Sequence, residues 1–389
     1  MAEPGKRPKV AVIVRRFGME FGGLEAYAVN LVRELHEAYD IHVFCQEWSS
    51  DLPVARTVVP RIKRLPSWLN LLVFTQHCRK LVSGFDLVHS HENSWLGDLH
   101  TVHMMPTRFS LYHRRPPWHR HLSVWTSPRL LAYLAMEAMR YRAGDRREIV
   151  AVSPLILDQI ETAYRRHPRA TVIPPGVNAP TRQMDRIEAL DALGLPHDRY
   201  YAILVAHEPV RKGLNVLLAA LPLVDAPVDL IVVGGDRNTA ARVGEFAAKA
   251  RQPLRVHSWP LQRDLSVFYA AADICAFPTS GDSFGMVPLE AMSYGRPVIV
   301  SSQDYCGFAH YVTHGVDAIV LDDPDDAVAL GMAIDRLFAD EALYASLASN
   351  GKSLSLEMGW DKVAARYAQV YRQIQSRPDP RTLPPAAPG

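Results

Sequence analysis

Asp282 and Glu290, two carboxylates separated by seven residues, are the side chains of this sequence best placed to do chemistry. They fall in residues 273–301, where a strand, a loop, a short helix and a second strand are expected. The unpaired backbone amides at a helix start attract an anion, above all a phosphate, and carboxylates beside them accept hydrogen bonds from the hydroxyl groups of a polyol. A phosphate with hydroxyl groups beside it describes a nucleotide sugar. Two solvated acids on an ordinary strand–helix unit are the alternative.

The elements that position these two acids can be read from the residues around them. Residues 274–277 form an apolar run of strand length that Pro278 ends, and residues 298–300 form the next buried strand. The short helix between them has Pro288 near its first turn, where a missing N–H is tolerated. Gly295 stands where a helix C-cap is expected.

Residues 273–301 resemble the donor-site motif of retaining glycosyltransferases of family 4, in which two glutamates are separated by seven residues. Asp282 stands in place of the first glutamate. The resemblance implies a GT-B fold, an α/β architecture of two Rossmann-like domains that face each other across a cleft, with a C-terminal helix that crosses back to the first domain. The positions that match the family pattern as they stand are Phe284, Gly285, Glu290, Ala291, Met292, Gly295, Pro297, Val298 and Ile299.

The same resemblance implies a donor site. The family has an arginine and a lysine that grip the diphosphate after the first strand of the second domain; Lys212 matches the lysine, whereas His207 replaces the arginine and Arg211 is a nearby charge. An ordinary surface lysine is the alternative for Lys212. Glu290 is expected to accept the ribose hydroxyls, and Asp282 those of the sugar. The expected donor-binding residues of this domain are His207, Arg211, Lys212, Trp259, Asp282, Ser283, Phe284, Gly285, Met286 and Glu290.

The N-terminal half opens with a strand at residues 9–14, a glycine turn at Gly22 and Gly23, and a helical pattern. Two glycines let a ligand approach the backbone closely, although a simple tight turn explains them equally well. Residues 21–48 also look like bacterial lipopolysaccharide-core glucosyltransferases. The family resemblance implies that both glycines approach the donor diphosphate and the acceptor, and we place Glu25 among the acceptor-binding candidates.

Two histidines, His91 and His103, each follow a strand-like run. Side chains at the ends of parallel strands lie where such sheets bind ligands. His103 matches the histidine of the family's T-x-H pattern, which implies a contact with the transferred sugar; a satisfied histidine at the sheet edge is the alternative. His91 and Asp98 are further acceptor-side candidates. A zinc site is not expected, because neither a cysteine nor a helical pair of histidines supports one.

Residues 106–147 differ in composition from the rest of the chain, because they hold nine arginines and two acids with aromatic residues between them. Arginines and aromatic rings together are typical of a face that rests on an anionic membrane, although a solvated insertion is the alternative. No other part of the chain reads as a nucleic-acid module. The arginines are Arg108, Arg114, Arg115, Arg120, Arg129, Arg140, Arg142, Arg146 and Arg147.

Length and composition favour two globular domains, because 389 residues with 48% hydrophobic content can bury two cores. The four cysteines form no C-x-x-C pair and read as small buried residues in a reducing compartment. Neither a secretory signal nor a membrane-spanning run is expected. We expect an acceptor-binding domain at 1–178, a nucleotide-sugar-binding domain at 179–356, a crossover helix at 357–376 that packs on the first domain, and a disordered tail at 377–389.

We therefore predict a retaining, metal-independent hexosyltransferase with His103, Lys212 and Asp282 as its catalytic residues and no cofactor. Its co-substrate is a nucleotide-diphosphate sugar, with a UDP-sugar favoured, and its acceptor a glycolipid or glycan of cell-envelope polysaccharide or lipopolysaccharide biosynthesis. The expected location is cytoplasmic, peripheral on the inner face of the cytoplasmic membrane, with no nucleic-acid partner. The alternatives are a nucleotide-sugar epimerase or phosphorylase on the same fold, and a two-domain sugar-binding protein.

Overall fold

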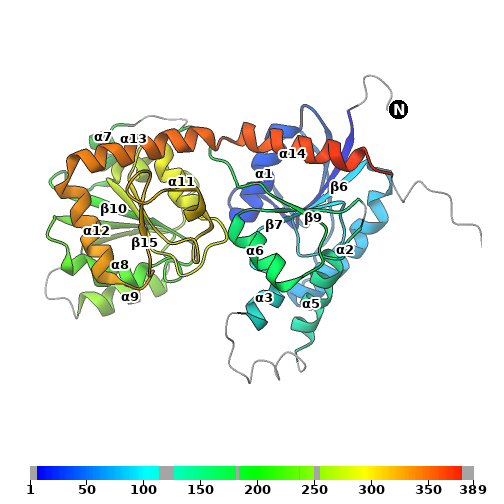
Figure 1. Ribbon diagram of the computed structural model, residues 1–389, viewed down its shortest axis with the longest axis horizontal. Helices are drawn as coiled ribbons and strands as arrows, with labels where there is room; N and C mark the ends of the chain where they lie inside the picture. Colours follow the sequence, from blue (N-terminus) through cyan, green and yellow to red (C-terminus); the bar gives the residue numbers. More distant parts are fainter. Residues whose placement is uncertain are drawn as a thin grey trace, which may run out of the picture. The chain divides into compact units, whose positions relative to one another are not determined.

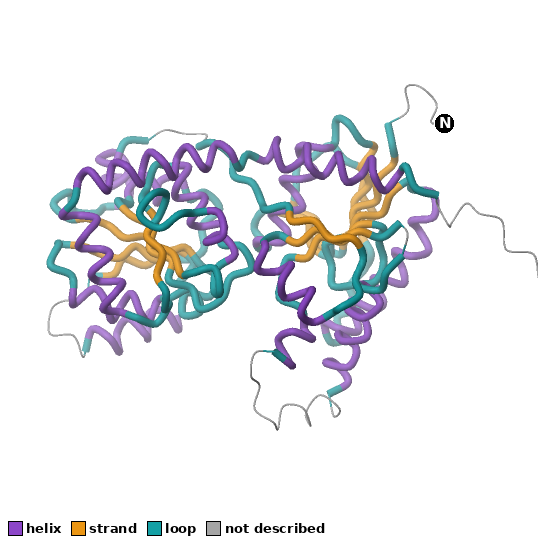
Figure 2. The backbone as a smooth tube through the Cα atoms, viewed as in Figure 1, coloured by secondary structure: helices purple, strands orange, loops and turns teal. Residues whose placement is uncertain are grey.

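The computed structural model describes residues 7–113, 127–144, 146–180, 184–235, 237–248 and 255–378. The chain forms two compact units (Figure 1), one made of Met1–Pro175 and Trp360–Gly389 and the other of Gly176–Gly359. In each unit a parallel sheet lies between helices (Figure 2). Two Rossmann-like α/β domains are therefore present, as the sequence predicts.

The sheet of the first unit has seven parallel strands in the order β5-β3-β1-β6-β7-β8-β9. Its central strands are buried along their length, as expected for a parallel sheet covered on both faces. A separate two-stranded sheet pairs β2 (Arg16–Gly18) with β4 (Glu47–Ser49). The strands of the large sheet are β1 (Lys9–Ile13), β3 (Asp40–Cys45), β5 (Ala55–Val58), β6 (Leu87–Ser90), β7 (Leu99–Val102), β8 (Glu148–Ala151) and β9 (Arg169–Val172).

The helices of the first unit cover this sheet and include the C-terminal helix. Ser153 caps α6 by accepting a hydrogen bond from the amide of Ile156 at 3.2 Å, with Pro154 in the first turn. Helix α14 packs beside α1 (Figure 1), so the last helix completes the unit that the chain begins. The helices are α1 (Gly23–Leu35), α2 (Ser67–Leu81), η1 (Val82–Gly84), α3 (Thr107–Tyr112), α5 (Pro128–Arg140), α6 (Pro154–Ala163) and α14 (Trp360–Gln375).

The sheet of the second unit has six parallel strands in the order β12-β11-β10-β13-β14-β15. The chain runs outward from β10 through β11 to β12, returns to the other side of β10 as β13, and then runs outward again. The strand order therefore reverses between β10 and β13. The strands are β10 (Tyr200–Val205), β11 (Val228–Val233), β12 (Val256–Trp259), β13 (Ile274–Phe277), β14 (Val298–Ser301) and β15 (Ile319–Leu321).

The helices of the second unit connect these strands, as in any Rossmann-like fold. Gly295 follows α11 with φ +68°, the left-handed conformation expected of a helix C-cap. No helix among the described residues is long and apolar enough to cross a membrane. The helices are α7 (Arg186–Leu193), α8 (Leu214–Ala220), η2 (Leu221–Leu223), α9 (Arg237–Ala247), α10 (Ser266–Ala271), α11 (Met286–Ser293), η3 (Gly307–Tyr311), α12 (Ala327–Ala339) and α13 (Glu341–Glu357).

Candidate functional site

The second unit has its ligand edge where β10 and β13 end. In open α/β sheets, ligands bind outside the carboxyl ends of the strands at the point where the strand order reverses. The loop after β10 carries residues 206–213, and the loop after β13 carries residues 278–285. The topology therefore brings together the two sequence segments expected to hold the donor.

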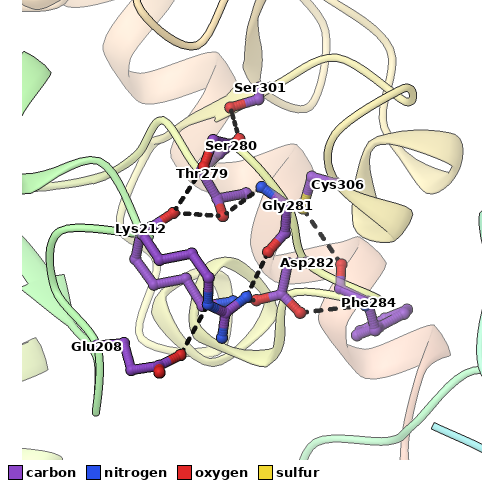
Figure 3. Close-up of polar contacts among 10 residues, drawn as sticks. Glu208, Lys212, Thr279, Ser280, Gly281, Asp282, Phe284, Ser301 and Cys306 are labelled. Atoms are coloured by element: carbon purple, nitrogen blue, oxygen red, sulfur yellow. Dashed lines mark hydrogen bonds and ion pairs between the residues drawn. The ribbon is translucent and has the colours of Figure 1, made fainter. Parts of the chain in front are cut away.

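Lys212 and Asp282 form an ion pair across these two loops (Figure 3). The Nζ atom of Lys212 donates to Oδ2 of Asp282, and the two side chains are 11% and 21% exposed. Burial lowers the pKa of Lys212, while the carboxylate of Asp282 opposes that shift. The other carboxylate oxygen of Asp282 accepts a hydrogen bond from the Phe284 amide at 3.3 Å. Asp282 thus links the lysine to the residues that lead into α11.

Arg211 joins the same two loops through both its side chain and its backbone. Its guanidinium donates to the carbonyl oxygen of Gly281 at 2.6 Å and to the carboxylate of Glu208 at 2.8 Å. Its carbonyl oxygen accepts hydrogen bonds from the Ser280 amide and from the hydroxyl of Thr279, both at 3.3 Å. Arg211 is therefore committed in part to holding the loops together, and it remains half exposed.

Two glycines allow this close approach of the loops. Gly213 has φ +102°, and a Cβ atom at this position would lie 2.4 Å from the carbonyl oxygen of Pro278. Gly285 has φ +98° and caps α11, and its Cβ atom would lie 2.8 Å from the sulfur of Cys306. Both positions require glycine for conformation and for space. Because Gly213 follows Lys212 directly, the close packing at this glycine places Lys212 next to Asp282.

Helix α11 carries Glu290 beyond its first turn. The carboxylate accepts a hydrogen bond from the hydroxyl of Tyr269 at 2.6 Å, and burial raises its pKa while this hydrogen bond opposes the shift. Tyr269 is a functional candidate that the sequence reading missed; the signal was a tyrosine in a helix whose buried hydroxyl needs a partner. The N-cap of α11 is Gly285, which has no side chain to cap the first amides, so an anion can bind them.

The other expected donor-binding residues lie near the ends of neighbouring strands. His207 follows β10 and is exposed. Trp259 is the last residue of β12 and packs edge-on against Phe268, with ring centroids 5.3 Å apart. Ser283 and Met286 flank the N-cap of α11. The structure places all of them on the carboxyl side of the sheet, where the Lys212–Asp282 pair lies.

The first unit has a comparable edge where β1 and β6 end. Gly22 is the N-cap of α1 with φ +149°, and Gly23 begins the helix. Glu25, in the first turn, accepts hydrogen bonds from the guanidinium of Arg16 at 2.7 and 3.0 Å. The structure therefore pairs this acceptor-side candidate with an arginine that sequence reasoning did not single out.

His91 and His103 meet at this edge, one following β6 and the other following β7. Nδ1 of His91 lies 3.0 Å from Nε2 of His103, and the rings are stacked with centroids 5.2 Å apart. Tyr27 packs edge-on against His103 at 4.8 Å. Burial and the charge of Arg140 together lower the pKa of His91 to about 3. Burial, His91 and Arg140 lower the pKa of His103. Both rings are therefore neutral at physiological pH.

A buried chain of hydrogen bonds runs beside this pair and ties α14 to the sheet. The hydroxyl of Tyr27 donates to that of Tyr367 at 2.8 Å, and the hydroxyls of Tyr367 and Thr101 lie 2.8 Å apart. His89 reaches Thr101 through Nε2 and Tyr371 through Nδ1, both at 2.8 Å. The partners lie far apart in sequence, so no local sequence motif predicts this network.

Asp98, an expected acceptor-side residue, is not brought to this edge. It precedes β7, so it lies at the opposite end of that strand from His103. Its carboxylate accepts a hydrogen bond from the Val88 amide at 2.9 Å and lies 3.7 Å from Nε of Arg146. These contacts give Asp98 a structural role at the amino ends of the strands.

The arginine-rich segment is only partly described: Arg114, Arg115 and Arg120 lie outside the described residues. Arg140 and Arg146 are 4% and 8% exposed. Arg140 donates to the carbonyl oxygen of Thr101 at 2.8 Å, and Arg146 donates to the carbonyl oxygen of Asp86. These two arginines serve the interior of the first unit and do not face a membrane. Exposed apolar side chains nevertheless remain on and beside α3 and α5: Met104, Tyr112, Leu131 and Met139.

Glu137 fixes the beginning of α3 against α5. Its buried carboxylate accepts hydrogen bonds from the amides of Thr107 at 2.5 Å and Arg108 at 3.1 Å, and from the hydroxyl of Tyr164 at 3.1 Å. An acid at the start of a helix satisfies amides that lack an intrahelical partner.

Within the described parts of the chain, no group of three or more histidine, cysteine, aspartate or glutamate side chains is arranged to hold a metal ion.

Comparison with protein families matches both halves of the chain. Residues 21–179 match the family described as "Glycosyltransferase Family 4", and residues 185–354 match "Glycosyl transferases group 1". A D-inositol 3-phosphate glycosyltransferase of Xylanimonas cellulosilytica is 26% identical over 404 residues, which cover 92% of this chain and 93% of the relative.

Solved structures show the same fold. WaaG, a glycosyltransferase involved in lipopolysaccharide biosynthesis, superposes with a TM-score of 0.80 at 19% identity and covers 93% of this chain and 99% of its own. HepE from Anabaena, solved in complex with UDP-glucose, gives a TM-score of 0.72 at 17% identity, with coverage of 94% and 99%.

Proposed function

This chain belongs to the glycosyltransferases of the GT-B fold, and from that premise we propose that it transfers a sugar from a nucleotide-diphosphate sugar to an acceptor with retention of configuration. The observation that carries the proposal is the Lys212–Asp282 pair at the ligand edge of the second unit, next to the start of α11. A UDP-sugar is the proposed donor, because HepE binds UDP-glucose.

The first chemical requirement is to stabilise the leaving diphosphate, whose negative charge grows as the glycosidic bond breaks. Fixed donors that point at developing charge can supply this stabilisation without a metal ion. Lys212 provides a largely buried ammonium group, and the uncapped amides at the start of α11 provide a second site for phosphate oxygens. Arg211 is a further cation near the diphosphate, and His207 is a further side chain that can contact it.

The remainder of the donor is recognised through its hydroxyl groups and its base. Glu290 accepts the ribose hydroxyls, with its carboxylate held by Tyr269. Asp282 accepts hydroxyls of the transferred sugar while Lys212 binds the adjacent phosphate. Trp259 lies at the strand end that we assign to the nucleobase.

Retention follows from attack on the face of the sugar from which the phosphate departs. A bond forms between the acceptor oxygen and the anomeric carbon as the bond from that carbon to the phosphate oxygen breaks, and the departing phosphate takes the proton of the acceptor hydroxyl. No protein nucleophile is needed. We assign His103 to the transferred sugar and Gly22, Gly23 and Glu25 to the diphosphate and acceptor. His91 is not assigned to a ligand, because it is only 2% exposed.

For the acceptor we propose a glycolipid or glycan of the cell envelope, reached by a protein that rests on the inner face of the cytoplasmic membrane. The support is the arginine-rich segment 106–147 without its buried Arg140 and Arg146, together with four exposed apolar side chains: Met104 beside the segment and Tyr112, Leu131 and Met139 within it. Arginines and apolar side chains together suit the headgroup region of an anionic bilayer.

A vesicle-binding assay tests this surface. Wild-type protein is expected to bind anionic vesicles in a salt-sensitive manner and not to bind neutral ones. Replacing Arg114, Arg115 and Arg120 by serine should weaken binding by about 1 kcal/mol for each residue. A matched variant with Arg165, Arg166 and Arg169 replaced by serine, all exposed in the same unit, should bind as wild type does. An equal loss of vesicle binding in both variants would show that residues 106–147 are a solvated insertion and not a membrane-binding surface.

A second acceptor class is favoured by the relatives. The curated relatives with 25–27% identity are called D-inositol 3-phosphate glycosyltransferases. We therefore keep a soluble phosphorylated polyol as the competing acceptor, since its phosphate and the arginines have complementary charges.

Incubation with radiolabelled UDP-glucose in the presence of EDTA tests the proposed reaction. Transfer of label to an envelope glycolipid fraction or to D-inositol 3-phosphate identifies the acceptor class, and NMR of the anomeric proton of the product shows whether configuration is retained. Label recovered only as free sugar or as an epimer would overturn the transferase proposal. A requirement for Mg²⁺ in the transfer step would overturn the metal-free mechanism.

A further inference from the structure

His91 is buried and meets His103 through a single pair of nitrogens. His91 is only 2% exposed, and its Nδ1 atom lies 3.0 Å from Nε2 of His103. His103 is partly exposed and makes no other hydrogen bond with the residues that the structure describes. Since a neutral imidazole has one N–H and one bare nitrogen, this contact requires one ring to donate and the other to accept.

The second nitrogen of His91 decides between the two arrangements. Nε2 of His91 is buried without a hydrogen-bond partner in the described parts of the chain. Among buried backbone groups, an N–H without a partner is rarer than an acceptor without one, and we apply the same order of preference to the imidazole nitrogens. The proton of His91 is therefore expected on Nδ1, where it has a partner, and Nε2 is left bare.

We propose that His91 donates its Nδ1–H to Nε2 of His103, which fixes the proton of His103 on Nδ1 and makes this nitrogen a hydrogen-bond donor toward an oxygen of the transferred sugar. His91 is then a positioning residue for His103. The tautomer follows from the protein alone, whereas the identification of the sugar as its partner rests on the proposed function.

The surroundings of the pair favour neutral rings in one orientation. Burial and the positive charge of Arg140 lower the pKa of both histidines. Tyr27 packs edge-on against His103, and its own hydroxyl is held by Tyr367. The ring of His89 lies with its centroid 4.3 Å from that of His91, and hydrogen bonds to Thr101 and Tyr371 hold it in place. This packing fixes the orientation of the rings, so the two histidines can differ only in which nitrogen carries the proton.

Nitrogen-15 NMR of the histidine-labelled full-length protein tests the tautomer without any substrate, because long-range couplings to the ring protons distinguish a protonated from a bare nitrogen. The expected result is protonated Nδ1 and bare Nε2 in both His91 and His103, with His103→Gln used to assign the signals. Protonated Nε2 in His103 would overturn the proposal whatever the protein's activity.

Two substitutions test the role of the tautomer. His91→Asn places an amide N–H near the position of Nδ1, so His103 should keep its proton on Nδ1 and turnover should stay close to wild type. His91→Leu removes the donor, so both tautomers of His103 should appear and turnover of UDP-glucose should fall roughly two- to tenfold, the effect of one hydrogen bond. Thermal melting shows whether each variant is folded.

The outcomes separate this proposal from the proposed function. The predicted tautomer in a protein that transfers no sugar would contradict the glycosyl-transfer proposal and leave the His91–His103 geometry standing. If His91→Asn loses as much turnover as His91→Leu while both remain folded and His103 keeps the wild-type tautomer, His91 does not act through the tautomer and its positioning role is refuted. If His91→Leu fails to fold, the wild-type spectrum and His91→Asn still decide the question.

Discussion

Replacing Lys212 by methionine, which keeps the unbranched chain of the side chain except its terminal ammonium group, separates two roles of the Lys212–Asp282 pair. The two side chains are 11% and 21% exposed, so Lys212→Met leaves a largely buried carboxylate without its ammonium partner. Breaking a fully buried pair costs about 3–5 kcal/mol, and an exposed pair contributes about 0–1 kcal/mol. The partial exposure here places the expected loss of unfolding free energy at about 1–3 kcal/mol.

The loss of turnover has a different origin. Charge on the diphosphate is larger in the transition state than in the bound donor, so a fixed cation contributes more to the rate than to binding. Removal of one fixed donor to a developing oxyanion lowers kcat by about 10²–10³-fold. The double variant Lys212→Met/Asp282→Asn removes the unpaired carboxylate as well, so it should regain most of the stability and little of the turnover.

Urea unfolding measures the first effect, and transfer from saturating radiolabelled UDP-glucose measures the second. Lys352→Met, a change at an exposed lysine on α13, is the control and should alter neither quantity. Recovery of turnover in the double variant would show that Lys212 acts only by neutralising Asp282. A kcat of Lys212→Met within a few-fold of wild type would refute its assignment to the leaving group.

Three further perturbations test the same site. Glu290→Gln should weaken donor binding in calorimetry by about 1.5–3 kcal/mol. This variant should also be more stable than the wild type at neutral pH, because burial raises the pKa of Glu290. The wild type therefore loses stability as the pH rises from about 4.3, the pKa of an unfolded glutamate, through the raised pKa of the folded protein. Urea titrations should therefore show this difference vanishing in acid, and a difference independent of pH would contradict it. Asp282→Ala should lower turnover more than affinity for bare UDP, whereas equal losses of affinity for UDP-glucose and UDP would place Asp282 on the nucleotide. Gly213→Ala should lower the free energy of unfolding by more than about 1–2 kcal/mol, because the new Cβ would lie 2.4 Å from the Pro278 carbonyl oxygen. The control Gly244→Ala, at a glycine with open space around it, should be neutral or stabilising by up to about 1 kcal/mol. Equal shifts in the melting temperature of the two variants would contradict this reasoning.

The fold was predictable because its signals are local. Short apolar runs bounded by proline and glycine predict the buried strands β13 and β14, and Gly295 ends the helix between them as expected. The family resemblance then supplied the doubly wound topology, which no periodicity contains.

The contacts within the site were harder to predict, because they depend on strand order. Lys212 and Asp282 lie in loops after β10 and β13, and only the reversal of strand order between these strands makes them neighbours. The partners Arg16 for Glu25 and Tyr269 for Glu290 carry no motif of their own. For Asp98 the signal was present: it precedes its strand, and side chains at that end lie away from the ligand edge.

The first unit is discontinuous in the chain, because it needs both Met1–Pro175 and Trp360–Gly389. During synthesis the second unit, Gly176–Gly359, emerges whole and can fold while the first still lacks its last helix. Until α14 leaves the ribosome, the hydroxyls of Tyr27 and Thr101 lack Tyr367, and His89 lacks Tyr371. The aromatic and polar groups beside His103 thus reach their native contacts only after α14 has been synthesised, so a chain that stops before α14 cannot assemble this part of the site.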